Sequence, residues 1–240
     1  MARKFTATFW GVRGSAPAMD GATARYGGDT SCVEVLCGER RLVLDLGGGA
    51  RRLGQELARR PGAPLTLLLS HAHYDHVMGL PCFAPFRMAE AQVLALSPVP
   101  GGVAALAAGL MRAPFYPVGP EALTAGITDL HAAPGDMFEP AEGVRLSCAA
   151  TRHDGGALAW RIDFEGRSLV YAPDHEAGDA DTDRTLAHFA AGCDLLIHDA
   201  TLPGAAPWGR HGHSSWGAAV LAARRAEARR LARFHHHPEA

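Results

Sequence analysis

Six consecutive residues, His71-Ala72-His73-Tyr74-Asp75-His76, constrain this chain more than any other stretch. They place three imidazoles and one carboxylate directly after an apolar run, residues 65–70, that predicts a buried strand. A loop that follows a strand end can direct several donor atoms at one point. Imidazole nitrogen and carboxylate oxygen bind zinc at about 2.0–2.2 Å. The segment therefore predicts a metal site at the end of a strand.

Apolar and β-branched runs predict strands in both halves of the chain. The expected strands are residues 4–10, 32–37, 41–46, 65–69, 92–97, 144–151, 158–164, 168–171, 194–197 and 230–234. Helices are expected over residues 50–60, 103–112, 182–191 and 216–227. Two strand-rich halves with helices, and no polar linker between them, predict two sheets packed face to face with helices outside. We expect a single domain over residues 1–240.

The stretch from residue 81 to residue 140 is rich in proline and contains Phe83, Phe86, Phe115 and Tyr116. It is either a packed connecting segment or a lid or pocket wall over the metal site, and the sequence leaves both open.

Composition limits the classes of function. The net charge of −2 supplies no basic field that would attract nucleic acid. No apolar stretch reaches the length of a membrane span, and the N-terminus lacks the apolar core of a signal peptide. The five cysteines are odd in number and form no C-x-x-C pair, which predicts reduced thiols. We therefore expect a cytoplasmic protein that has no membrane partner.

Further motifs accompany the histidine segment along nearly the whole chain. They are FWGVRGS at residues 9–15, YGGDTSC at 26–32, GLP at 79–81, HDGGAL at 153–158, YAPD at 171–174, LIHDA at 196–200, GHSS at 212–215 and FHHHP at 234–238. Together they resemble the metallo-β-lactamase fold hydrolases. The resemblance implies an α/β (α+β) fold, a four-layer αββα sandwich with metals at one edge between the sheets. Within the superfamily the chain looks most like the phosphodiesterase branch, which includes tRNA 3′-processing endonucleases and the cyclic ribose-phosphate phosphodiesterase of phosphonate breakdown.

The resemblance also implies the metal ligands. One metal would be bound by His71, His73 and His153, a second by Asp75, His76 and His235, and Asp174 would bridge both. Five imidazoles and two carboxylates suit two divalent ions, expected as Zn²⁺ with Mn²⁺ or Fe²⁺ as alternatives.

Several of these assignments have alternatives. His153 and Asp174, taken alone, could be ordinary polar residues at strand ends, and the family motifs favour the ligand role. His236 and His237 compete with His235 for the ligand position. A partial affinity tag is disfavoured because an apolar strand leads into these histidines.

A hydroxide shared by two metals about 3.5–4 Å apart would attack phosphorus in a small nucleotide or cyclic phosphate diester. Asp75 and His213 are the expected catalytic residues, His213 as the proton donor to the leaving oxygen. His213 could also merely neighbour a helix cap formed by Ser214 or Ser215.

Asp45 and Asp199 end apolar strands and are expected to hold metal-binding histidines through their second N–H, or to be plain turn residues. Other histidines are expected at the surface or in a polar core: His131, His175, His188 and His211.

The main alternative function is hydrolysis of a carbonyl substrate by a lactonase, thioesterase or β-lactamase. Zinc β-lactamases often carry cysteine where this chain has Asp174, and diiron redox relatives typically carry glutamate where it has His73. A non-catalytic metal-binding domain is a further alternative, disfavoured by the complete ligand set. Nucleic-acid substrates are not expected because no basic arm is present. Relatives are often dimers, so a homodimer stays open.

Overall fold

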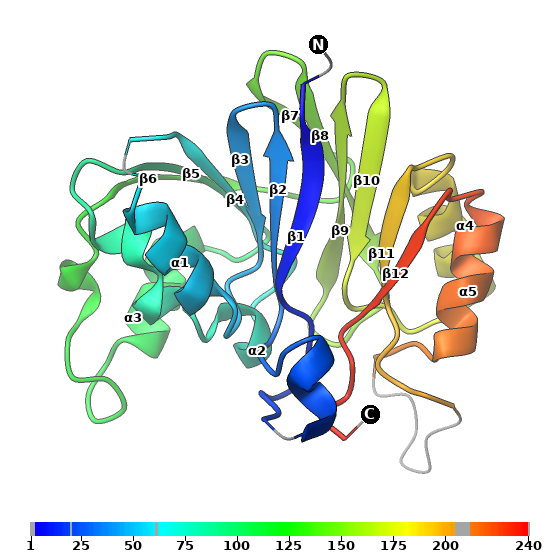
Figure 1. Cartoon of the computed structure of the whole chain (residues 1–240), viewed down its shortest axis with the longest axis horizontal. Helices are drawn as coiled ribbons and strands as arrows, with labels where there is room; N and C mark the ends of the chain where they lie inside the picture. Colours follow the sequence, from blue (N-terminus) through cyan, green and yellow to red (C-terminus); the bar gives the residue numbers. More distant parts are fainter. Residues whose placement is uncertain (1–2, 20, 61, 205–211, 240) are drawn as a thin grey trace. The chain divides into compact units, whose positions relative to one another are not determined.

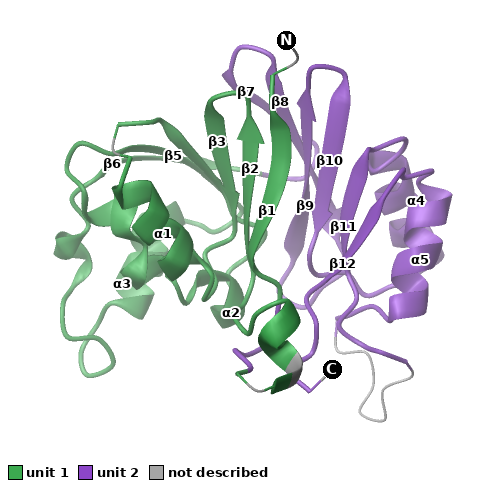
Figure 2. Ribbon diagram, in the orientation of Figure 1, with its two compact units in different colours: residues 1–12, 19–132 green, residues 13–18, 133–240 purple. Residues whose placement is uncertain are grey.

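The apolar runs of the sequence form two six-stranded sheets, one in each of two compact units. A computed structural model describes residues 3–19, 21–60, 62–204 and 212–239. The first unit comprises residues 1–12 and 19–132, and the second comprises residues 13–18 and 133–240 (Figure 2). Two strand-rich halves were expected from the sequence, whereas a single domain over residues 1–240 stays a prediction.

The first sheet has the strands in chain order (Figure 1). They are β1 (Phe5–Gly11), β2 (Cys32–Cys37), β3 (Arg40–Leu44), β4 (Leu65–Leu68), β5 (Gln92–Ser97) and β6 (Gly126–His131). β1, β2 and β3 pair antiparallel, and β3 to β6 pair parallel. Parallel strands end at the same edge of a sheet, so the loops after β3 and β4 leave the sheet side by side.

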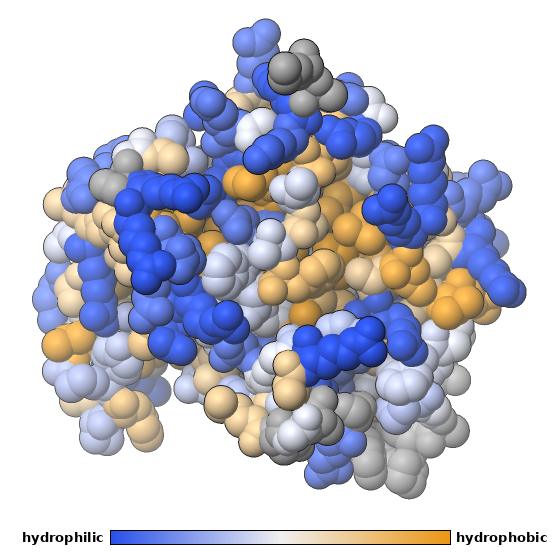
Figure 3. All heavy atoms as spheres, in the orientation of Figure 1, coloured by the Kyte–Doolittle hydropathy of each residue, from blue (hydrophilic) through white to orange (hydrophobic). Residues whose placement is uncertain are grey.

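Helices of this unit are α1 (Ala50–Ala58), α2 (Tyr74–Val77) and α3 (Gly102–Leu110). Short 3₁₀ helices lie at residues 21–25, 80–82, 84–87 and 120–122. α1 buries Ala50, Leu53, Gly54 and Leu57 at helical spacing. Its other face carries exposed arginine and glutamate side chains, and Figure 3 shows hydrophilic side chains over this helix.

The second sheet has the order β12-β11-β10-β9-β8-β7. Its strands are β7 (Met137–Ala141), β8 (Val144–Thr151), β9 (Ala157–Phe164), β10 (Arg167–Ala172), β11 (Leu195–Asp199) and β12 (Leu231–Phe234). β7 to β10 form an antiparallel meander, and β10, β11 and β12 are parallel. β8, β10, β11 and β12 consequently run in one direction and end at one edge of this sheet.

The described part of the second unit has two helices, α4 (Ala180–Phe189) and α5 (Trp216–Arg225), which lie beside each other (Figure 1). Ser215 is the N-cap of α5, since its hydroxyl accepts a hydrogen bond from the Ala218 N–H. The cap that the sequence suggested for this helix is therefore formed.

The stretch from residue 81 to residue 140 is more regular than the sequence suggested. It contains β5 and α3, as expected, and also the edge strand β6 and most of the edge strand β7, which were not predicted. Phe83 and Phe86 are fully buried in the core of the first unit, whereas Phe115 is 78% exposed. Within the described residues, no helix combines the length and apolar character that crossing a membrane requires.

All five cysteines are free; four are buried and Cys82 is exposed. Burial raises the pKa of the Cys148 and Cys193 thiols to about 11 and raises that of Cys32 well above its usual value. A raised pKa leaves less thiolate, which is the reactive form, at pH 8.

We therefore predict that the native protein reacts rapidly at pH 8 with dithiobisnitrobenzoate at one thiol per chain. Cys82→Ser should remove this fast phase. The released thionitrobenzoate is measured by absorbance, and denatured protein provides the total thiol count. Survival of the fast phase in Cys82→Ser would contradict the burial of the other four.

Candidate metal centre

The histidine loop of the first unit is held by one buried carboxylate, that of Asp45. Asp45 follows β3 directly, and Ser70 follows β4. The Ser70 backbone N–H and hydroxyl donate to the two Asp45 carboxylate oxygens, each at 2.7 Å. The Nδ1 atom of His76 lies 2.8 Å from Asp45 Oδ2. A carboxylate accepts here, so Nδ1 of His76 carries the proton and Nε2 carries the lone pair that can bind a metal.

A second imidazole is oriented by the same serine. The Ser70 hydroxyl lies 2.9 Å from Nδ1 of His71, and since it donates to Asp45 it accepts from His71. Nε2 of His71 thereby has the lone pair that metal binding needs. The His71 ring centroid is 4.5 Å from that of His73 and 4.3 Å from that of His76. These three rings therefore form one cluster in the first unit.

The helical turn α2 buries some of the remaining residues of the motif and exposes another. Asp75 and His76 are 7% and 0% exposed, whereas Tyr74 is 64% exposed. Asp75 Oδ2 lies 3.4 Å from His76 Nε2. Gly47, in the loop after β3, permits this packing, because a Cβ there would lie 2.2 Å from the Asp75 carbonyl oxygen.

In the second unit, three imidazole nitrogens surround one carboxylate oxygen. Asp174 Oδ1 lies 3.6 Å from His153 Nε2, 3.4 Å from His235 Nε2 and 3.5 Å from His213 Nδ1. Hydrogen bonds of this kind measure about 2.7–3.2 Å. Ligand atoms of a tetrahedral zinc site with bonds of about 2.0–2.1 Å lie about 3.3–3.4 Å from one another. The spacing of the buried Asp174 carboxylate from His153 and His235 therefore suits metal ligands better than directly bonded partners.

Asp199, at the end of β11, holds the loop that carries His213. Its carboxylate accepts from the Thr201 N–H and hydroxyl at 2.9 and 2.7 Å, and from the His175 N–H at 3.1 Å. Nδ1 of His213 lies 2.9 Å from Asp199 Oδ2. The Thr201 hydroxyl in turn lies 2.9 Å from Nδ1 of His235. Asp199 thus orients His213 directly and His235 through Thr201.

His153, two residues beyond the end of β8, is oriented by a backbone carbonyl. Its Nδ1 lies 2.9 Å from the Gly212 carbonyl oxygen, which can only accept. Its ring centroid lies 5.2 Å from that of His213, and the rings of His213 and His235 stack at 4.8 Å. The second unit therefore also forms a compact imidazole cluster.

The structure brings His235, and not its two neighbours, to Asp174. His236 is half-buried, burial lowers its pKa, and its carbonyl accepts from the Gly14 N–H. Nδ1 of His237 accepts from the Glu239 N–H. A Cβ on Gly14 would lie 2.1 Å from His235 Nδ1, so only glycine allows the chain to pass this ring.

Two site residues adopt the left-handed backbone that favours glycine. Asp45 has φ 58° and His235 has φ 59°. Each directly follows the last residue of a strand, Leu44 of β3 and Phe234 of β12. The sharp turn at each position directs the side chain into its cluster as the strand ends.

His175, expected at the surface or in a polar core, is a buried polar residue whose partners the sequence did not indicate. This side chain is 2% exposed, and its Nε2 lies 3.0 Å from Asp183 Oδ1 in α4. Its carbonyl accepts from the Ser214 hydroxyl. It therefore ties the segment after Asp174 to the His213 loop, and its position next to Asp174 was the available signal.

Of the other histidines outside the predicted ligand set, His131 is exposed on β6. His198 is fully buried, and burial lowers its pKa. His211 lies outside the described residues.

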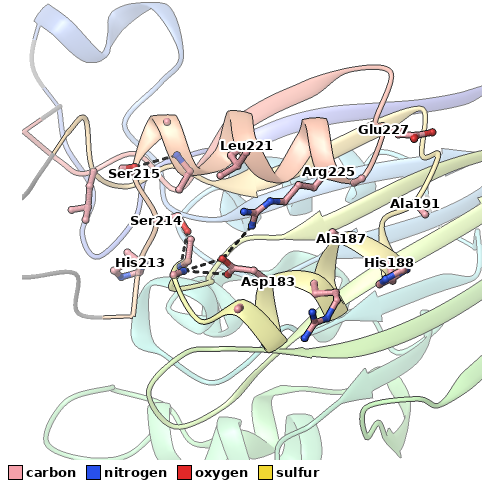
Figure 4. A pocket seen from close by; sticks show the side chains of 18 of the residues that line it. Asp183, Ala187, His188, Ala191, His213, Ser214, Ser215, Leu221, Arg225 and Glu227 are labelled. Carbon is pink, nitrogen blue, oxygen red and sulfur yellow. Dashed lines mark hydrogen bonds and ion pairs between the residues drawn. The ribbon is translucent and has the colours of Figure 1, made fainter.

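A hollow of about 1430 Å³ lies between α4 and α5 and reaches His213. Figure 4 shows Asp183 and Arg225 extending toward each other from the two helices, with an N–O distance of 3.6 Å. Much of the lining consists of alanine and glycine residues. His188 also lines this hollow.

The imidazole and carboxylate groups of the two units suit the binding of divalent metal ions. Four imidazoles have Nδ1 engaged with an acceptor that leaves the lone pair on Nε2: His71, His76, His153 and His235. This is the usual arrangement of metal-binding histidines, whose second nitrogen is held by a carboxylate, hydroxyl or carbonyl. Within the second unit, two groups have ligand atoms within 4.8 Å of one another: His153 with Asp174 and His213, and Asp199 with His213 and His235.

Solved structures with a similar fold include three proteins. One is YhfI from Bacillus subtilis, a metallo-beta-lactamase fold protein, with 20% identity, a TM-score of 0.71, and coverage of 96% of this chain and 85% of that one. A diphosphatase from the PhnP family has 17% identity, a TM-score of 0.72, and coverage of 99% and 88%. The short form of human tRNase Z has 20% identity, a TM-score of 0.70, and coverage of 96% and 92%.

Among curated protein sequences, none matches the chain significantly. One family model does match, that of the beta-lactamase superfamily domain, over residues 40–236. The two mixed sheets and these similarities confirm the expected α/β fold class. Because the family model spans most of the sequence, the chain belongs to the beta-lactamase superfamily domain family and has the metallo-β-lactamase fold.

Proposed function

We propose that this member of the metallo-hydrolase superfamily is a phosphodiesterase that hydrolyses a small nucleotide or cyclic phosphate diester. The observation that carries the proposal is the His213–Asp199 pair beside the Asp174 carboxylate. It places an imidazole that can donate a proton next to a carboxylate whose surroundings suit a metal ligand. Hydrolysis of a diester that releases an alkoxide needs both a proton donor and a bound metal.

The metal ligands follow from the donors of each unit and from the family resemblance. One ion would be held by His71, His73 and His153, a second by Asp75, His76 and His235, with Asp174 shared. Bound divalent ions supply a water deprotonated near neutral pH and neutralise charge on phosphoryl oxygens. Zinc suits this nitrogen-rich set, with manganese or iron as alternatives.

His213 is the proposed proton donor. Its Nδ1 donates to Asp199, which leaves Nε2 as the atom that exchanges a proton with the leaving oxygen. The buried Asp199 carboxylate stabilises the imidazolium form and keeps the ring from turning. His213 is 14% exposed, so its edge is accessible to a ligand.

The names of two similar structures, a diphosphatase and a tRNase, support a phosphorus-containing substrate. The net charge of −2 favours a small substrate over a polynucleotide.

The proposal is tested by the initial rate of bis(p-nitrophenyl) phosphate hydrolysis with protein loaded with Zn²⁺ or Mn²⁺. We expect turnover that a chelator abolishes and added metal restores. Absence of turnover, with bound metal confirmed by elemental analysis, would count against a phosphodiesterase and direct attention to lactones and thioesters.

We predict that His73→Ala abolishes this turnover and lowers the metal content per chain, because one imidazole ligand is lost. Elemental analysis after gel filtration measures the metal. His131→Ala is the matched control, since that exposed histidine on β6 lies outside both clusters. Full metal content in His73→Ala would remove His73 from the ligand set.

We predict that the His213→Ala variant keeps its metal. Its rate of hydrolysis should fall more for a substrate whose leaving group is more basic. The rate should fall about 100-fold or more for a cyclic nucleotide diester, whose alkoxide needs a proton. It should fall far less for bis(p-nitrophenyl) phosphate, whose leaving group is a weak base. Equal losses on both substrates, or loss of metal, would show that His213 is not the proton donor. His131→Ala, at an exposed position on β6 outside both clusters, serves as the matched control.

A further inference from the structure

A small aromatic hollow lies on the outer side of the histidine loop, within the first unit. It measures about 310 Å³, and its lining includes Tyr74, Met78, Leu110, Arg112, Phe115 and Tyr116. A volume near 300 Å³ is at the lower end of the range for small-molecule pockets. The hollow is therefore large enough for one planar group and too small for a polymer.

One wall comes from the same helical turn that carries predicted metal ligands. Tyr74 and Met78 are four residues apart, so they share one side of α2, whereas Asp75 and His76 are buried on the other. Tyr74 stands between His73 and Asp75 in the sequence. Any group bound in the hollow would consequently contact Tyr74, a residue that directly adjoins predicted ligands in the sequence.

The opposite wall is a turn that follows α3. The backbone N–H groups of Phe115 and Tyr116 both donate to the Arg112 carbonyl at 2.9 Å, which holds these three side chains on one turn. The Tyr116 hydroxyl donates to the Pro81 carbonyl at 3.4 Å and accepts from Arg87 at 3.3 Å. The wall is therefore formed in advance of any ligand.

Both walls carry an exposed aromatic ring. Tyr74 is 64% exposed and Phe115 is 78% exposed, so each offers ring surface on which a planar ligand can stack. Arg112 adds a planar cation with several donors, which suits a ring with carbonyl or ring-nitrogen acceptors.

We propose that this hollow is the subsite for the nucleobase of the substrate, so that the preferred substrate is a nucleotide diester. Stacking of a base on an aromatic side chain strengthens binding by about 5- to 150-fold. Tyr74 and Phe115 supply the stacking surfaces, and Arg112 binds the edge of the base. The link from base binding to catalysis rests on the proposed phosphodiesterase function.

The test is isothermal titration calorimetry of the metal-loaded protein with adenosine 5′-monophosphate and with ribose 5-phosphate, which lacks the base. We expect the nucleotide to bind at least about 5-fold more tightly than the sugar phosphate. Phe115→Ala should weaken nucleotide binding by a similar factor and leave ribose 5-phosphate binding unchanged. Arg112→Gln should likewise weaken binding of the nucleotide and leave binding of ribose 5-phosphate unchanged.

Val118→Ala is the matched control, because Val118 is an exposed apolar side chain nearby that does not line the hollow. Equal affinities for the two ligands in the unmodified protein, or a nucleotide affinity indifferent to Phe115→Ala, would overturn the inference. Binding is measured without turnover. Base-selective binding with no diester hydrolysis would thus sustain the subsite and remove the phosphodiesterase, and hydrolysis without base selectivity would do the reverse.

Discussion

The hydrogen bonds that hold Nδ1 of five clustered imidazoles are the interactions on which the rest of the site depends. An imidazole can present a lone pair at Nε2 in a fixed direction only while its other nitrogen donates to a fixed acceptor. The acceptors are Asp45, Ser70, Thr201, Asp199 and the Gly212 carbonyl. Most of them lie within two residues of a strand end, so the sheets set the directions of the rings. The sheet positions the acceptor, and the acceptor orients the imidazole.

The two units solve this problem in the same way. Each has a fully buried carboxylate at or just beyond the end of a parallel strand, Asp45 after β3 and Asp199 on β11. Each carboxylate accepts from a hydroxyl, a backbone N–H and an imidazole. Burial of a carboxylate is costly unless such donors satisfy it, so these hydrogen bonds serve folding as well as orientation. Loss of either carboxylate would leave several buried donors without an acceptor.

Sequence reasoning succeeded where the signal was local. The bounds of β2, β5 and β8 agree with the predicted ranges, because each is an apolar or alternating run between turn residues. β6 and β7 were missed because they are edge strands with mostly exposed or half-buried side chains, and pairing with β5 and β8 defines them. The histidine motif was visible for the same local reason. The acceptor of His153 was not, since a backbone carbonyl 59 residues away carries no residue-type signal. The partner of His175 was likewise not predicted, because Asp183 comes within reach only after α4 packs.

At Asp45 and His235, the left-handed backbone sets the stability of the fold against the need for a functional side chain. A non-glycine residue in this conformation costs about 1–2 kcal/mol. Glycine would relieve that cost at either position but would delete a carboxylate or an imidazole that the clusters need. Substitutions that stabilise the fold at these positions would therefore remove side chains that the site needs. Selection for stability alone would favour glycine at both positions, so the presence of Asp45 and His235 is explained by the contacts of their side chains.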